Sequence, residues 1–318
     1  MKKRVSKAKI GQYLQRPAVY IPAAVLCCVL WASAFPVIKR GYVYFHIAPE
    51  DYAAQILFAG CRFALAGLLV ILLGSLIARK PLVPRRGKTC AHIGILAVVQ
   101  TVVQYGLFYF SLAKIEGSAG SVLNAAGTFF CVLLSAAVFS EDRMHWKKAL
   151  GCVLGLLGIV VLHFKNLHLA FHLTGEGFML LSAASHAASA VLIKKFSESD
   201  SPALLSGWQF FLGGCAMAAI GALCGGKLST FTPAGGASIA YLALVSAVAY
   251  TLWSILLKYN AVSKIAVFGF IIPIGGVVLS ALLLGEQVDI ARSAICLALV
   301  SAGVVMVNSN LSACRQIN

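Results

Sequence analysis

The sequence predicts an all-α polytopic membrane protein with ten transmembrane helices arranged as two inverted repeats of five helices. Three observations point to this fold class: an apolar composition, a series of apolar runs long enough to span a bilayer, and an internal repeat. Of the 318 residues, 60% are hydrophobic and only 11% are charged, and the mean hydropathy is +0.89. Soluble chains carry roughly 25% charged residues, so this composition excludes a soluble domain.

Ten apolar runs follow one another along the chain, and a helix needs about 20 residues to cross a bilayer. Short segments with Gly, Pro or charged residues separate these runs, and no linker divides the chain into soluble domains. We expect a basic segment at 1–16, five-helix repeats at 17–164 and 177–308, and a tail at 309–318. The expected spans lie near 17–38, 52–78, 91–112, 117–140, 149–164, 177–193, 203–225, 236–257, 265–285 and 293–308.

The basic residues predict the orientation of the chain. There are 26 Lys and Arg against ten Asp and Glu, which gives a net charge of +16. With the N-terminus inside, the inner segments hold 19 of these basic residues and the outer segments hold six, while Arg62 lies within a span. This bias follows the positive-inside rule and predicts a cytoplasmic (inner) membrane protein with both termini in the cytoplasm. The charge is therefore a topology signal with anionic lipids as secondary partners, and we expect no nucleic-acid partner.

The two halves of the chain are similar in sequence. Trp31–Arg40 aligns with His186–Lys195, and Tyr105–Phe108 aligns with Tyr250–Trp253. Because each half has an odd number of spans, the second half enters the membrane from the opposite side, as in transporters that work by alternating access. The N-terminus also has features of a cleavable signal peptide, but cleavage would remove one span and break this symmetry.

Several short motifs carry a resemblance to a known family. They are Leu30-Trp31-x-Ser33-x-Phe35, Arg62-Phe63, Tyr250-x-Leu252-Trp253, the run from Leu282 to Glu286, and Pro273. In combination they resemble the EamA-type branch of the drug/metabolite transporter superfamily. The resemblance implies ten helices around a central substrate cavity, with Pro273 as a hinge. The chain departs from the usual family pattern at Thr128, Ser140 and His186, where Pro, Gly and Trp are more common.

Two polar residues are expected deep in the membrane. Arg62 lies about ten residues, or roughly 15 Å, into its span, where a cation costs at least about 2.5–3.5 kcal/mol. Its guanidinium either contacts a substrate carboxylate or phosphate, or is a structural group bonded to carbonyls of neighbouring helices. His186 is similarly deep, and it either takes a proton or bonds a substrate, or it stays neutral beside a hydroxyl.

Neutral polar and aromatic side chains are predicted to line a cavity around these two residues. Gln100 and Gln104 are one helical turn apart and share a face of the third span. An aromatic cavity with a few hydrogen-bonding groups suits small amphiphilic solutes, whereas polar contacts between helices are the alternative role. The predicted substrate-binding residues are Trp31, Arg62, Gln100, Gln104, Tyr105, Asn124, His186, Gln209, Tyr250 and Trp253.

Other kinds of site are not indicated. All ten carboxylates fall in loops or at span ends, so a deep carboxylate proton relay is missing, and we interpret Glu141 and Glu286 as helix caps. The sequence has no phosphate-binding P-loop, and its ten cysteines form no C-x-x-C pair. We therefore expect neither a cofactor nor a metal ion.

The sequence thus predicts a secondary transporter with a small-molecule substrate. The resemblance favours export of small organic metabolites such as amino acids, by alternating access through a central cavity. A lipid translocator or a channel-like pathway is the main alternative. An intramembrane enzyme is least favoured, because the sequence lacks H-E-x-x-H and G-x-S-x-G motifs, although His186 and a nearby serine are a conceivable dyad.

Overall fold

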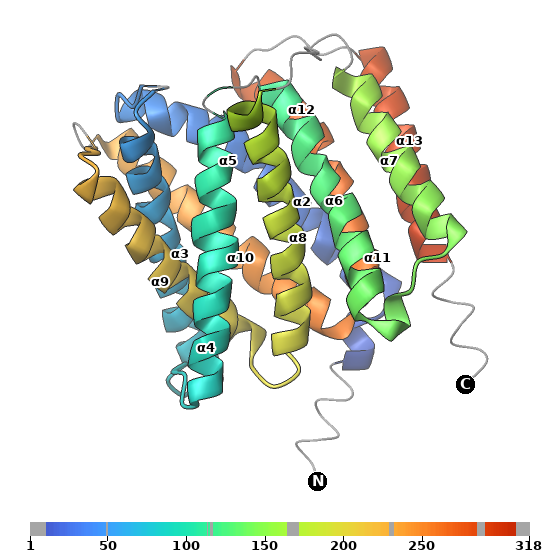
Figure 1. Ribbon diagram of the computed structural model, residues 1–318, viewed down its shortest axis with the longest axis horizontal. Helices are drawn as coiled ribbons and strands as arrows, with labels where there is room; N and C mark the ends of the chain where they lie inside the picture. Colours follow the sequence, from blue (N-terminus) through green and yellow to red (C-terminus); the bar gives the residue numbers. More distant parts are fainter. Residues whose placement is uncertain are drawn as a thin grey trace.

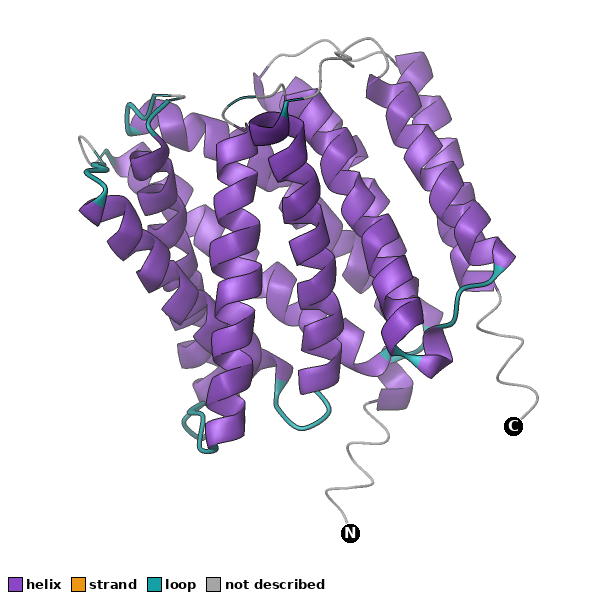
Figure 2. Cartoon of the chain, viewed as in Figure 1, coloured by secondary structure: helices purple, strands orange, loops and turns teal. Residues whose placement is uncertain are grey.

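The computed structural model describes residues 11–48, 50–112, 114, 117–163, 172–228, 232–284 and 290–309. Within these residues every regular element is a helix, and the long helices run in alternating directions (Figures 1 and 2). The predicted all-α fold class is therefore confirmed.

Among the described residues, the first half of the chain contains five long helical rods. Its third rod is continuous but changes pitch, because the π-helical segment η1 joins α4 to α5. Its elements are α2 (Pro17–Tyr44), α3 (Tyr52–Ala78), α4 (Gly87–Leu96), η1 (Ala97–Gln104), α5 (Tyr105–Leu112), α6 (Gly117–Val138), η2 (Ser140–Asp142) and α7 (Trp146–His163).

The second half contains a similar succession. One of its rods changes from α-helix to 3₁₀-helix and back, at the segment η5 that precedes Pro273. Proline has no backbone N–H and cannot bond the carbonyl four residues earlier, which accounts for the local change of pitch. Its elements are η4 (Leu173–Gly177), α8 (Phe178–Phe196), α9 (Pro202–Leu223), α10 (Pro233–Tyr259), α11 (Val262–Ala266), η5 (Val267–Phe270), α12 (Ile271–Leu284) and α13 (Ile290–Ser309).

Six helices of the described chain are long and apolar enough to cross a membrane, and three shorter helices are also apolar. The six are Pro17–Tyr44, Tyr52–Ala78, Gly87–Leu112, Leu173–Phe196, Pro202–Leu223 and Pro233–Tyr259, and the three are Leu123–Val138, Val262–Gly276 and Ala294–Val307. The chain is therefore a multi-pass membrane protein. The count of ten spans in two inverted repeats remains a prediction.

Helix ends follow ordinary capping chemistry. The Asp51 carboxylate accepts a hydrogen bond from the Ala54 N–H at 2.9 Å at the start of α3, and Thr232 Oγ1 accepts one from the Gly235 N–H at 3.0 Å in α10. α3 ends at Ala78, and its C-cap residue Arg79 has a left-handed φ of 50°. These caps satisfy backbone N–H groups that the first turn of a helix leaves free.

Glycines allow two pairs of helices to approach closely. α3 packs along α9 at one side of the molecule, and α7 packs along α13 at the other (Figure 1). A Cβ atom at Gly214 of α9 would lie 2.2 Å from the Ala64 backbone nitrogen of α3, and one at Gly151 of α7 would lie 2.8 Å from the Gly303 carbonyl oxygen of α13. Such small-residue contacts are how helices associate in lipid.

The remaining contacts join the middle of the bundle. α2 packs against α10 and α12, while α8 packs against α6 and against the rod formed by α4, η1 and α5. α2 begins and α13 ends at the same end of the bundle, the lower end in Figure 1. The helices that surround the centre therefore come from both halves of the chain.

We predict that Gly214→Ala lowers the free energy of unfolding by about 1–3 kcal/mol, because the added methyl group forces two backbones apart. The measurement is thermal unfolding of the purified protein in detergent. Gly106→Ala is the matched control, since a Cβ atom at Gly106 would meet nothing within 4 Å. Equal losses in the two variants would contradict the close packing of α3 against α9.

Candidate functional site

The centre of the bundle holds two neighbouring cavities, which we name the larger and the smaller compartment. Their volumes are about 90 Å³ and about 40 Å³. Both are lined by Trp31, Asn124, His186 and Ile272. The larger compartment is also lined by Ala34, Phe35, Arg62, Gln104, Tyr105, Phe108, Val245, Ser246 and Tyr250. The smaller compartment is also lined by Ala125, Thr128, Cys131, Trp253, Ala266, Gly269 and Pro273.

Most of the residues predicted from the sequence meet at these compartments, but two glutamines do not. Gln100 and Gln209 are absent from both linings, and the Gln209 side-chain amide donates a hydrogen bond to Gln100 Oε1 at 2.5 Å. Both residues are buried. This pairing is a polar contact between helices, which is the role that the sequence indicates as the alternative to lining the cavity.

Arg62 is held inside the bundle by aromatic rings. Its side chain is only 3% exposed, and its guanidinium carbon lies 4.2 Å from the ring centre of Phe63 and 5.5 Å from that of Tyr105. The negative faces of these rings offset part of the cost of removing a cation from water. Arg62 Nε has no hydrogen-bond partner among the described residues. A donor of a buried cation is thus left for a ligand in the larger compartment.

Trp31 lines both compartments and contacts an aromatic ring of each. Its ring centre lies 4.9 Å from that of Tyr250, which lines the larger compartment, and 4.9 Å from that of Trp253, which lines the smaller one. Tyr250 also makes a hydrogen bond to the hydroxyl of Tyr105. These aromatic contacts fix the shape of both compartments, because each ring is packed against at least one other.

Further polar atoms at the cavity are buried without a partner in the described part of the chain. They comprise one donor, Trp31 Nε1, one acceptor, Gln104 Oε1, and the ring nitrogen His186 Nδ1. Unpaired buried polar atoms are costly, and in native structures each calls for an explanation such as a ligand. Ser189 Oγ donates to the backbone carbonyl of His186 at 2.7 Å, so this hydroxyl is not directed at the imidazole as a catalytic dyad requires.

Some lining residues were not predicted from the sequence. Ser246 lies one helical turn before Tyr250 on α10, and this spacing was the available signal. Phe35 belongs to the first family motif but was not predicted to line the cavity. Cys131, Ala266 and Gly269 carry no signal of their own in an apolar sequence, because small residues are common throughout.

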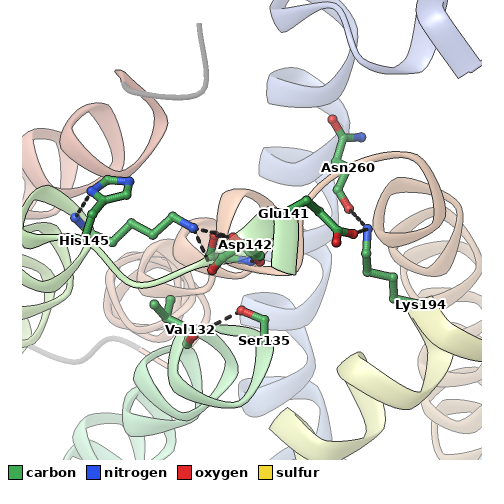
Figure 3. A network of polar contacts seen from close by, with 9 residues as sticks. Val132, Ser135, Glu141, Asp142, His145, Lys194 and Asn260 are labelled. Atoms are coloured by element: carbon green, nitrogen blue, oxygen red, sulfur yellow. Dashed lines mark hydrogen bonds and ion pairs between the residues drawn. The ribbon is translucent and has the colours of Figure 1, made fainter. Parts of the chain in front are cut away.

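A network of buried polar contacts closes the end of the bundle where α2 begins. The Asp142 carboxylate makes an ion pair with Lys148 and accepts hydrogen bonds from the Ser263 hydroxyl and, at 2.9 Å, from the Ser263 N–H (Figure 3). All three residues are buried. Because Asp142 belongs to the first half of the chain and Ser263 to the second, this contact ties the two halves together. Asp142 therefore caps the start of α11, whereas the predicted cap Glu141 has its contact with Lys194. Glu286 lies outside the described residues.

Other contacts at the same end also join the two halves. Lys194 Nζ lies 3.8 Å from Glu141 of the first half, whose side chain is 60% exposed (Figure 3). Within the second half, Lys194 Nζ also donates to the Asn260 carbonyl oxygen at 2.8 Å. His92 Nδ1 lies 2.8 Å from the Asp200 carboxylate. Partial burial on its own raises the pKa of the Asp200 carboxyl. Hydrogen bonds from Thr89, His92 and Ser199 together have the larger effect, so the net result is a lowered pKa.

Comparison with known proteins identifies the class of the chain. The family described as the EamA-like transporter family matches residues 19–164 and again residues 173–309. The chain belongs to this family.

Similar proteins and structures agree with this membership. A Salmonella typhimurium protein named "Probable amino-acid metabolite efflux pump" is 30% identical, over 83% of this chain and 86% of its own. A Streptantibioticus cattleyicolor protein named "Probable terminal-alkyne amino-acid exporter" is 27% identical, over 90% of this chain and 92% of its own. One solved structure matches with a TM-score of 0.72 at 18% identity, covering 93% of this chain and 98% of its own, and so has the same fold.

We predict that Asp142→Asn lowers the free energy of unfolding by about 3–5 kcal/mol, because it leaves the buried Lys148 cation without its counter-charge. Glu141→Gln is the matched control: the same acid-to-amide change at the neighbouring, mostly exposed side chain is expected to cost no more than about 1 kcal/mol. Chemical or thermal unfolding in detergent compares the two variants. A loss for Asp142→Asn no greater than for Glu141→Gln would show that the buried network does not hold this end together.

Proposed function

We propose that the chain is a secondary transporter that exports small metabolites of the amino-acid class by alternating access. The observation that carries this proposal is a central cavity, lined by helices from both halves, with the buried cation Arg62 at its edge. None of the described residues that line the cavity is a carboxylate. The cavity thus presents an uncompensated positive charge to a solute, which favours an anionic group.

The cavity lining supports the substrate class. A carboxylate bound by the Arg62 guanidinium and near Trp31 Nε1 would satisfy donors that have no partner among the described residues. Gln104 Oε1 is an unpaired acceptor for an ammonium group, and the faces of Tyr105 and Tyr250 also attract cations. The two relatives whose names specify amino-acid metabolites agree with this class.

We propose ten spans in two inverted halves, with the predicted boundaries at 17–164 and 177–308. Three observations support this arrangement. The family matches the chain twice, with one match in each half. The packing of α2 against α10 and α12 has its counterpart in the packing of α8 against the η1–α5 rod and α6. Tyr105 and Tyr250, which align in the repeat, meet at the centre and bond each other.

The conformation described by the structure fits one state of an alternating-access cycle. The smaller compartment lies toward the polar network of Asp142 and Ser263, since Cys131 and Ala266 are the lining residues nearest along α6 and α11 to that end. By the charge bias this end is cytoplasmic, in an inner membrane, with both termini on that side. Export then requires the polar network of Asp142 and Ser263 to open toward the cytoplasm. The change of helix pitch just before Pro273 supports a hinge at this proline.

We predict that Trp253→Ala lowers amino-acid counterflow in proteoliposomes about tenfold, because it removes an aromatic wall of the cavity and the ring contact to Trp31. Trp146→Ala is the matched control: this indole is 66% exposed at the start of α7 and lies outside both linings. Its counterflow should equal that of the wild type. Both variants must first be shown to be folded by thermal unfolding in detergent.

Two results would contradict the proposed function. In the first, the wild-type protein gives no counterflow with any amino acid but moves labelled lipid between leaflets, which would favour lipid translocation. In the second, the protein conducts solute without saturation or exchange, which would favour a channel.

A further inference from the structure

We infer that the smaller compartment is a subsite for an unbranched apolar side chain of the transported amino acid, and that Gly269 and Thr128 set its width. This inference rests on the proposed function, because it presumes that the solute carries an amino-acid group. It adds a second binding site with its own selectivity, next to the polar one around Arg62.

The two compartments differ in chemistry. The residues that line only the larger one include the cation Arg62 and the polar side chains of Gln104 and Ser246. Those that line only the smaller one include Ala125, Ala266 and other side chains without a full charge. Asn124, His186 and Thr128 also line the smaller compartment, but none of its described lining residues carries a permanent charge as Arg62 does. The charged part of a zwitterion is therefore favoured in the larger compartment, and the smaller space remains for the side chain.

The boundary between the compartments restricts the shape of that side chain. The ring of Trp31 contacts Tyr250 of the larger compartment and Trp253 of the smaller one, with ring centres 4.9 Å apart in each case. A solute whose charged groups contact Arg62 reaches the smaller compartment past the side chains that line both, Trp31, Asn124, His186 and Ile272. Because the smaller compartment has a volume of only about 40 Å³, a straight chain fits it better than a branched or aromatic group.

One contact defines the far wall of the smaller compartment. Gly269 lies in the 3₁₀ segment η5, and a Cβ atom at this position would lie 2.8 Å from Thr128 Oγ1 of α6. Among the described residues outside its own helix turn and chain neighbours, no other atom would lie within 4 Å of that Cβ atom. A methyl group at position 269 therefore narrows the compartment against a single side chain, and shortening that side chain relieves the contact.

The test is counterflow in proteoliposomes with the series alanine, 2-aminobutyrate, norvaline and norleucine. In the wild type, each added methylene that enters the subsite should improve transport efficiency about fourfold, until the compartment is full. Gly269→Ala should lower the efficiency for the amino acid that the wild type transports best by about tenfold relative to the efficiency for alanine. The double variant Gly269→Ala/Thr128→Ala should restore the wild-type preference.

Gly276→Ala is the matched control on the same rod, since a Cβ atom at Gly276 would meet nothing within 4 Å. Its chain-length profile should equal that of the wild type. Thr128→Ala alone should shift the preference toward longer chains, and it tests the inference independently if Gly269→Ala does not fold.

The possible failures are distinguishable. If the wild type exchanges none of the four amino acids, the proposed function is wrong. If the wild type exchanges them but Gly269→Ala and Thr128→Ala both keep its chain-length profile, the subsite assignment alone is wrong. Loss of all four substrates to the same extent in a folded Gly269→Ala protein would also overturn the assignment, since that result indicates a general effect on transport.

Discussion

The burial of a permanent cation in an apolar bundle is the constraint on which the rest of the structure depends. A bilayer offers no water to Arg62, so the protein must supply its surroundings. The rings of Phe63 and Tyr105 lie close to the guanidinium, and the cavity that Arg62 lines has no carboxylate among its described lining residues. An internal counter-charge would have stabilised the fold but left no attraction for an anionic solute. Binding and stability therefore compete at this position.

The rest of the bundle can be understood as a frame around this site. Glycine contacts hold α3 to α9 and α7 to α13 on opposite sides. The cavity between these pairs is lined mainly by α2, α5, α6, α8, α10 and α12, and α3 contributes Arg62. One end is closed by polar contacts between the halves, chiefly the buried group of Asp142, Lys148 and Ser263.

Hydropathy and depth in the membrane were enough to predict the all-helical fold and many of the cavity residues. Trp31, Arg62 and His186 were found because polar or large aromatic groups stand out at the middle of apolar spans. The pairing of Gln100 with Gln209 could not be predicted, since a sequence does not show which helices are neighbours. Gly269 was missed for the opposite reason, because its importance comes from an absent side chain. The buried contacts of Asp142 were not predicted, and only the adjacent Glu141 was singled out, because sequence alone does not distinguish buried from exposed carboxylates in one turn.

The most direct test of the account is the thermal unfolding of the purified protein with a matched pair of ligands, norvaline and n-butylamine, which differ by the carboxylate. If Arg62 and the unpaired donors at the cavity bind a carboxylate, norvaline at 100 times its dissociation constant should raise the free energy of unfolding by about 2.7 kcal/mol. The amine should have little effect at the same concentration. Equal stabilisation by the two compounds would contradict the account, because the buried cation would then have no part in recognising the solute.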